Sequence, residues 1–175
     1  MKHSRLMVFA MFSFLSACSG PKIEDYEGRT PKADIRQFLN GEIAVWGTFT
    51  DRSGDVDPRF TATLKGTWKG DTGTLEEHFV YSDGKKQTRV WHITMVDDHH
   101  FTATAADVVG VAEGAQYGNA INLKYVLTVE KDGTSHDLKS DDWIFLVDEK
   151  HAMNRNVLTK FGFKVGELAI AFVKK

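Results

Sequence analysis

Residues 59–68, RFTATLKGTW, alternate between apolar and polar side chains along their whole length. Phe60, Ala62 and Leu64 fall on one face, and charged or hydroxyl side chains fall on the other. Successive side chains of a β-strand point to opposite faces of the sheet, so this pattern predicts a strand between a core and water. A similar alternation recurs in residues 121–129, INLKYVLTV, and in residues 168–173 the larger Leu168, Ile170 and Phe172 alternate with Ala169, Ala171 and Val173.

Turn-forming sequences separate the strand-like runs, mostly at intervals of about 12 to 18 residues. Asp51-Arg52-Ser53-Gly54, Ser82-Asp83-Gly84 and Asp132-Gly133 are examples. Nine or ten strands joined by short hairpins, without crossover helices, indicate an antiparallel meander. Closure removes exposed strand edges, so we expect an all-β, antiparallel up-and-down barrel of about eight to ten strands. A curved open sheet or a β-sandwich is the alternative.

One short helix is expected before the first strand. Thr30 suits the N-cap, Pro31 suits the first helical position, and Asn40-Gly41 supplies a stop signal. Three apolar residues with helical spacing lie between these signals: Ile35, Phe38 and Leu39. The helix is therefore expected to bury one face against the barrel.

The N-terminus has the pattern of a secretory signal peptide, with a basic start and an apolar run over residues 6–17. The run ends in Leu15-Ser16-Ala17-Cys18, which resembles the bacterial lipobox. That resemblance implies cleavage between Ala17 and Cys18, with a thioether-linked diacylglycerol and an N-acyl chain on Cys18. Ser19, where inner-membrane lipoproteins carry aspartate, implies the periplasmic face of the outer membrane of a Gram-negative bacterium. An ordinary signal peptide with a chance cysteine, or a buried thiol, is the alternative.

Composition excludes several classes of protein. The chain of 175 residues has 22 basic and 24 acidic residues, a net charge of −2 that argues against a nucleic-acid partner. A single cysteine excludes a disulfide framework and a thiolate zinc cluster. We therefore expect a signal peptide at 1–17, a lipidated cysteine and tether at 18–29, and one β-barrel domain at 30–175. Membrane contact is expected through the lipid anchor.

Several short motifs resemble those of one bacterial family. They include Ala44-Val45-Trp46-Gly47-Thr48-Phe49, Gly66-Thr67-Trp68, Ala106-Asp107-Val108-Val109-Gly110 and Asp141-Asp142-Trp143. On these residues the chain resembles an uncharacterised family of bacterial lipoproteins, catalogued as domain of unknown function 3833. The resemblance implies a lipocalin- or calycin-like barrel. It also implies lipid handling in the envelope, because some members are encoded near fatty-acid-modifying enzymes.

Asp142 is the polar residue that strand alternation places among apolar neighbours, on the face of Leu138 and Ile144. A carboxylate on that face needs a donor or a shifted pKa. Arg155 on the next strand is the expected partner, either as a structural ion pair or as part of a polar anchor for a lipid head group. Arg89, on the face of Trp91, offers a second positive charge, and Asp107 is expected to shape a turn.

Aromatic residues supply the apolar content, as core packing or as the lining of an apolar pocket. The candidate cavity residues are Trp46, Trp68, Trp91, His92, Tyr125, Asp142, Trp143 and Arg155. His92 either lines the cavity or faces solvent. Asp97-Asp98-His99-His100 is either a surface metal cluster or, as we favour, a solvated turn. The sequence has no G-x-S-x-G elbow, P-loop or dinucleotide fingerprint, so no catalytic residue, metal or cofactor is predicted beyond the lipid on Cys18.

Three functions remain open at this point. The first is non-catalytic binding or transport of a lipid, an acyl-chain molecule or another small hydrophobic molecule. The second is a structural or assembly role in the envelope through an unidentified protein partner. The third is a lipid-modifying enzyme that uses Asp142 or a histidine as acid or base.

Overall fold

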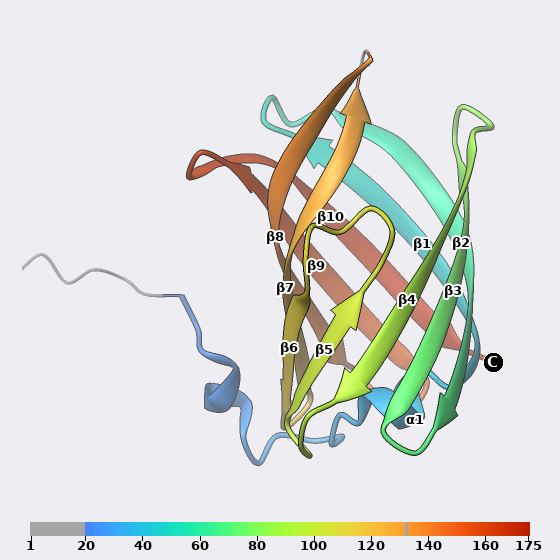
Figure 1. Cartoon of the computed structure of the whole chain (residues 1–175), viewed down its shortest axis with the longest axis vertical. Helices are drawn as coiled ribbons and strands as arrows, with labels where there is room; N and C mark the ends of the chain where they lie inside the picture. Colours follow the sequence, from blue (N-terminus) through green and yellow to red (C-terminus); the bar gives the residue numbers. More distant parts are fainter. Residues whose placement is uncertain (1–19, 132) are drawn as a thin grey trace, which may run out of the picture.

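A computed structural model describes residues 20–131 and 133–175 of the protein. They form a closed antiparallel barrel in which each strand pairs with its neighbours in sequence and β10 pairs with β1 (Figure 1). The ten strands are β1 (Gly41–Asp51), β2 (Val56–Lys69), β3 (Thr72–Tyr81), β4 (Lys86–Met95), β5 (His100–Thr104), β6 (Ala112–Tyr117), β7 (Ala120–Lys131), β8 (Thr134–Leu146), β9 (His151–Lys160) and β10 (Phe163–Lys174). The all-β barrel predicted from the alternation is confirmed.

The predicted signal peptide and the lipidation of Cys18 lie outside the described residues. Within residues 20–131 and 133–175, no helix has the length and apolar character needed to cross a membrane.

Alternation determines which side chains enter the barrel. On β2, Phe60, Ala62 and Leu64 are buried, while the residues between them are exposed. Leu64 lies opposite Ile43 of β1 on one side and Glu77 of β3 on the other. One inward-facing row therefore passes from an aliphatic core to an acidic side chain within three neighbouring strands.

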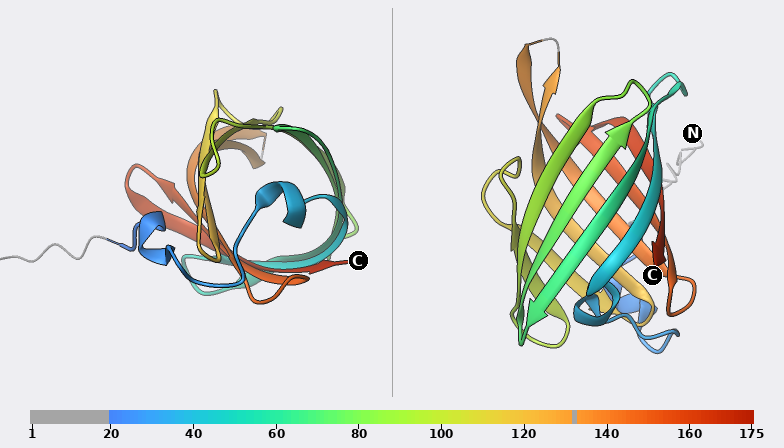
Figure 2. Two further views of the ribbon diagram at one scale, coloured as in Figure 1. Left: turned by 90° about the horizontal axis from the view of Figure 1, so that it is seen from below. Right: turned by 90° about the vertical axis from the view of Figure 1, so that its right-hand side faces the viewer.

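A short helix, α1 (Ile35–Phe38), covers one end of the barrel, which we call the closed end (Figure 2). Ile35 and Phe38 are buried there, and the Phe38 ring lies 6.4 Å from that of Phe172, centroid to centroid. Full burial of a side chain of this size contributes about 1.5–3 kcal/mol. Lys174 donates from Nζ to the carbonyl oxygens of Phe38 at 3.3 Å and Asn40 at 2.8 Å, so β10 holds the last carbonyls of the helix.

The predicted start of this helix is wrong. Thr30 is not the N-cap and Pro31 is not the first helical residue, because the helix begins at Ile35. Asp34 is the N-cap, and its carboxylate accepts a hydrogen bond from the backbone N–H of Arg36 at 2.9 Å. The preceding residues instead run along the barrel rim, where the backbone N–H of Ala33 donates to the Gly118 carbonyl at 2.7 Å.

A second short helix, the 3-10 turn η1 (Ile23–Tyr26), lies against the outside of the barrel. The ring centroid of Tyr26 lies 5.7 Å from that of Trp143 and 5.4 Å from that of Phe145, both on β8. Part of the segment expected to be a tether therefore packs on the barrel wall.

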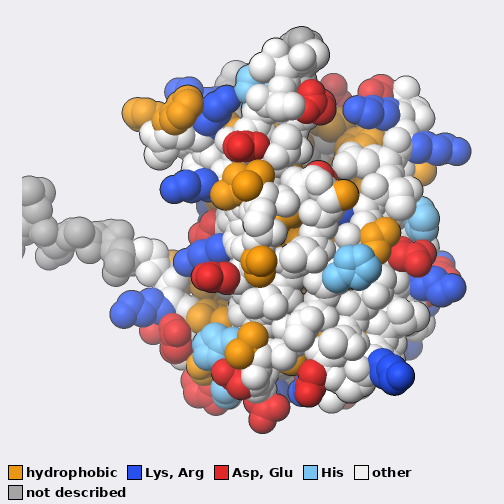
Figure 3. All heavy atoms as spheres, viewed as in Figure 1, with side chains coloured by type: hydrophobic (Ala, Val, Ile, Leu, Met, Phe, Trp, Pro, Cys, Tyr) orange, Lys and Arg blue, Asp and Glu red, His pale blue; other side chains and the backbone are white. Residues whose placement is uncertain are grey.

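The other end of the barrel, which we call the open end, is formed by the β1–β2, β3–β4, β7–β8 and β9–β10 hairpins, while the loop 105–111 between the short strands β5 and β6 lies lower on the barrel (Figure 1). On the face seen in Figure 3, acidic and basic side chains are interspersed, with apolar side chains between them. That face therefore presents no charge of a single sign that would steer an ionic partner.

Candidate functional site

A charged cluster occupies the barrel lumen on the side of β3 and β4. Arg89 of β4 donates from Nε and Nη2 to the carboxylate of Asp107 at 2.8–3.0 Å. It also lies 3.5 Å, from Nη1, from a carboxylate oxygen of Glu77. The indole N–H of Trp91 donates to the same oxygen of Glu77 at 3.3 Å. The three charged side chains are 12–26% exposed, so the ion pairs are largely withdrawn from water.

A hydrogen-bonded chain of polar side chains occupies the facing wall, on β7, β8 and β9. Ser140 donates to Asn156 at 2.7 Å, and Asn156 donates to the Tyr125 hydroxyl at 3.0 Å. Tyr125 in turn lies 3.4 Å, hydroxyl to carboxylate oxygen, from Asp142. Asn154 donates from Nδ2 to Asp142 as well. The ring of Trp91 meets that of Tyr125 edge-on at 5.4 Å, which joins the two walls.

The two inner acids have raised pKa values. Burial raises the pKa of Glu77 to about 7, although the positive charge of Arg89 opposes the shift. Burial likewise raises the pKa of Asp142 to about 6, against the hydrogen bonds from Asn154 and Tyr125. The negative charge of Asp142 adds to the raised pKa of Glu77, and the positive charge of Arg89 opposes the raised pKa of Asp142, so the two walls are electrostatically coupled.

Tyr125 and Arg89 keep their protons over the pH range in which the two acids titrate. Burial raises the pKa of Tyr125, and the negative charge of Asp142 adds to the shift. Burial lowers the pKa of Arg89, but attraction to Glu77 and Asp107 outweighs this effect, and the net pKa is raised. Tyr125 is therefore a neutral donor, and Arg89 is a permanent cation.

One polar atom of the cluster has no partner. Asn154 is only 4% exposed, and its Oδ1 is buried without a hydrogen bond. Its Nδ2 is engaged by two acceptors, Asp142 and the Trp143 carbonyl at 2.9 Å, which fixes the orientation of the amide. A buried acceptor without a donor costs about 1–3 kcal/mol.

Solvent reaches several inward-facing side chains above the closed end. Phe79, Leu127, Leu168 and Ile170 follow the inward alternation of their strands, yet each is only partly buried. The core residues nearest α1, such as Ile43, are fully buried. The lumen is therefore packed at the closed end and accessible toward the open end.

The structure divides the candidate cavity residues between three locations. Trp68, Trp91, Tyr125 and Asp142 face the lumen, and Trp68 lies at its closed end. Trp46 and Arg155 point outward, which corrects their expected place in the cavity, and His92 takes the solvent-facing alternative. Trp46 is 51% exposed, and the other two are also exposed. Trp143 is buried, but on the outer wall under Tyr26 rather than in a cavity.

The predicted pairing of Asp142 with Arg155 is wrong. In the β8–β9 ladder, Asp142 lies opposite Asn156, and Arg155 lies opposite Trp143, so the two charges occupy opposite faces of the sheet. Arg155 instead binds Glu167 on the outer surface at 3.1 Å.

Four further residues were not predicted to lie in the lumen. Glu77 holds the inward position between Leu75 and Phe79, and the same alternation rule was sufficient to place it there. Asn154 and Asn156 alternate within β9 in the same way, between Ala152 and Leu158. Asp107, expected only to shape a turn, binds Arg89, while its backbone carbonyl accepts from the Thr128 N–H at 2.8 Å.

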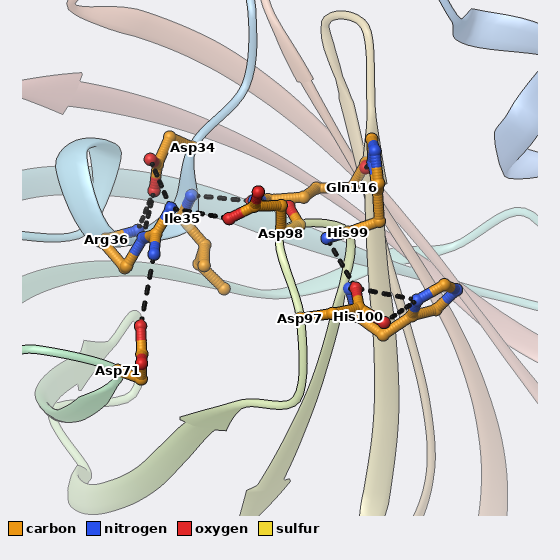
Figure 4. A network of polar contacts seen from close by, with 9 residues as sticks. All are labelled: Asp34, Ile35, Arg36, Asp71, Asp97, Asp98, His99, His100 and Gln116. Atoms are coloured by element: carbon orange, nitrogen blue, oxygen red, sulfur yellow. Dashed lines mark hydrogen bonds and ion pairs between the residues drawn. The ribbon is translucent and has the colours of Figure 1, made fainter.

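The Asp97–His100 segment forms a polar network at the closed end (Figure 4). The His100 ring and the backbone N–H groups of His99 and His100 donate to Asp97, which lowers the pKa of this carboxyl to about 2. Arg36 of α1 reaches Asp71 at 3.3 Å from the other side. No group of three or more metal-ligating side chains occurs among the described residues.

The outer wall carries a separate apolar groove of about 650 Å³. Trp46 of β1 lies beside Ala171 of β10, which lies beside Met153 of β9. On the other side of Trp46 the row continues through Thr61 of β2 to Val80 of β3. Trp46 and Met153 are each 51% exposed, so this row presents large apolar side chains to solvent.

Comparisons with known proteins support the fold. A family model described as "Protein of unknown function (DUF3833)" matches residues 12–174. No curated protein matches the sequence. An S-type phycobiliprotein lyase, CPES from Guillardia theta, has a similar structure, with a TM-score of 0.60 at 11% identity over 89% of this chain and 98% of the lyase. A redesigned β-barrel, mFAP1 bound to DFHBI, matches with a TM-score of 0.42 at 14% identity, over 82% of this chain and 100% of its own. The lyase similarity shows a shared barrel fold.

Proposed function

Because the chain belongs to the DUF3833 family, whose function is unknown, we propose a function from the barrel itself. We propose that the protein binds a small hydrophobic molecule, an amphiphile with an acyl or alkyl chain, inside the barrel. The ligand enters from the open end, and its polar head group meets the charged cluster. No chemical step is part of this proposal.

The observation that carries the proposal is the partial exposure of inward-facing apolar side chains above a charged cluster. Phe79, Leu127 and Leu168 supply an apolar wall that water reaches. Glu77 and Arg89 lie deeper and are only 12% and 16% exposed. An apolar lining with a few convergent polar groups is the usual composition of a small-molecule site. The likeness to a phycobiliprotein lyase adds support at the level of the fold.

The location of the protein is part of the same proposal. Lipidation of Cys18 would hold the barrel at the periplasmic face of the outer membrane, with residues 20–29 between the anchor and the first strand. Two or three acyl chains are sufficient for stable attachment, since each buried methylene contributes about 0.8 kcal/mol. A barrel held there would exchange its ligand with the envelope.

The test is native mass spectrometry of residues 19–175 purified from bacteria, combined with lipid extraction. We expect a reproducible co-purifying amphiphile near one per chain. Leu168→Trp fills the lumen and should abolish co-purification of the amphiphile. Ala169→Trp, at the next and outward-facing position, should retain the co-purifying amphiphile. A clean apo mass that added amphiphiles do not change would contradict the proposal.

The outer groove favours a second candidate function, a structural or assembly role through an envelope protein. Exposed tryptophan and methionine side chains are enriched at protein interfaces. A photo-reactive amino acid in place of Trp46 should crosslink to one partner in intact cells. The same substitution at His92, which is exposed outside the groove, is the control. Crosslinks of equal yield at both positions would contradict a specific partner.

A further inference from the structure

The lumen cluster carries more negative than positive charge. Glu77, Asp107 and Asp142 provide three carboxyl groups, and Arg89 provides the one guanidinium that contacts any of them among the described residues. Lys160 shares the inward alternation, but it lies at the end of β9 and donates to His136 there. An anionic head group in this lumen would therefore meet an excess of like charge.

Asp142 is the carboxylate without a counter-ion. Arg89 is shared by Glu77 and Asp107, and none of the ion pairs among residues 20–131 and 133–175 involves Asp142. Its donors are the amide of Asn154 and the hydroxyl of Tyr125, the latter at a long 3.4 Å. Both donors are neutral. A buried carboxylate without a cation carries a penalty of several kcal/mol when it is ionised.

Asn154 adds an independent sign of a missing donor. Its amide nitrogen binds Asp142, and its Oδ1 on the same group is buried without a partner. The amide cannot turn to correct this, because Nδ2 also donates to the Trp143 carbonyl. A carboxylate without a counter-ion therefore accepts from an amide whose own oxygen lacks a hydrogen-bond donor.

Aromatic rings adjoin both groups of polar side chains in the lumen. Trp91 and Tyr125 meet edge to face between the two walls, and Phe79 lies toward the open end. The Arg89 guanidinium carbon already lies 5.7 Å from the Trp91 ring centroid and 5.8 Å from that of Phe79. Such rings attract a cation within about 6 Å, so the aromatic part of the wall favours the same charge as the acids.

We propose that the lumen binds an amphiphile whose head group is a protonated amine, held by Asp142 and the free Oδ1 of Asn154, with Glu77 facing it from the opposite wall. This inference rests on the proposed lumen function and names its ligand class. An ammonium has three donors and no acceptor, which matches a set of unmet acceptors. A metal ion is disfavoured because the described residues offer no group of three metal-ligating side chains.

The test compares three probes of equal chain length: octylammonium, octanol and octanoate. Each is titrated calorimetrically into the full-length protein in phosphatidylcholine nanodiscs, and binding to empty nanodiscs is subtracted. We expect octylammonium to bind at least about tenfold more tightly than octanoate, since charge-assisted hydrogen bonds contribute about 1.5–3 kcal/mol. Octanol should fall between the two.

Substitutions test whether the preference for octylammonium arises at Asp142. Asp142→Asn should lower the ratio of octylammonium to octanoate affinity at least about fivefold. Asp141→Asn, the exposed neighbour that faces outward and binds Asn122, should leave the ratio unchanged. If Asp142→Asn does not fold, Glu77→Gln removes an acid from the facing wall and should lower the same ratio.

The outcomes separate the two proposals. Equal binding of the three probes, or a preference for octanoate, would overturn the amine head group and leave lumen binding in place. Failure of all three to bind would overturn lumen binding as well. A preference for octylammonium that survives both Asp142→Asn and Glu77→Gln would also overturn the assignment, because the selectivity would then arise elsewhere.

Discussion

Glu77→Gln should remove a pH dependence from the stability of the barrel. Burial raises the pKa of Glu77 from 4.5 to about 7, so the folded state holds this proton more tightly than the unfolded state does. The folded protein therefore gains stability from Glu77 below pH 4.5 and loses it as the pH rises through 7. At 1.36 kcal/mol per pKa unit, the full effect is about 3 kcal/mol.

The assay is urea unfolding of residues 19–175, followed by tryptophan fluorescence at pH 5 and pH 8. Between these values the wild type should lose about 2–3 kcal/mol more of its unfolding free energy than Glu77→Gln does. Asp142, which titrates in the same range, is present in both proteins, so the difference reports Glu77 together with its coupling to Asp142. Glu76→Gln, whose side chain is 52% exposed, should behave as the wild type does. Parallel pH profiles for the wild type and Glu77→Gln would refute the reasoning.

Three other substitutions test the closed end, the N-terminal segment and the anchor. Gly66→Ala should destabilise the barrel by about 1–3 kcal/mol in the same assay, because the added Cβ overlaps the Leu39 carbonyl under α1; a change below 0.5 kcal/mol would show that the helix shifts freely. Tyr26→Ala should speed amide exchange in residues 20–29 and leave the melting temperature of the barrel nearly unchanged, since it removes the ring contacts with Trp143 and Phe145 on the wall and with Arg29 in the same segment. Cys18→Ser should eliminate incorporation of labelled palmitate, and a variant that remains labelled would disprove lipidation at this cysteine.

The barrel was predictable because its strands obey one simple rule. In residues 59–68, every second side chain is apolar, and those side chains are the inward-facing ones of β2. Turn sequences such as Ser82-Asp83-Gly84 coincide with the hairpins between strands. Local sequence was less informative for the helix, where Thr30 and Asp34 both satisfy the rules for an N-cap. The backbone hydrogen bond from Ala33 to Gly118, a contact between distant segments, favours the later start.

The site was predictable only in part, because it depends on pairing between strands. Alternation correctly placed Asp142 inside, but its partner depends on the register of the β8–β9 hairpin. A change of one residue in that register moves the side chains of one strand to the opposite face of the sheet. In the observed register, Asn156 rather than Arg155 lies opposite Asp142 and faces the lumen. The ion pair between Arg89 and Asp107 joins β4 to the loop 105–111, and no local pattern specifies such a contact.

The position of the charged cluster is itself an argument for function. Buried ion pairs are often no more stabilising than apolar residues of the same volume, and an unpaired acid is costly. The closed end shows that this sequence builds an apolar interior where only packing is needed, with Ile43 and Phe38 fully or nearly fully buried. Toward the accessible part of the lumen it places acids with raised pKa values and an unmet amide oxygen instead. Buried groups that lower stability in this way are expected at functional sites. A bound cationic head group would offset the free-energy cost of the buried acids and of the unpartnered amide oxygen.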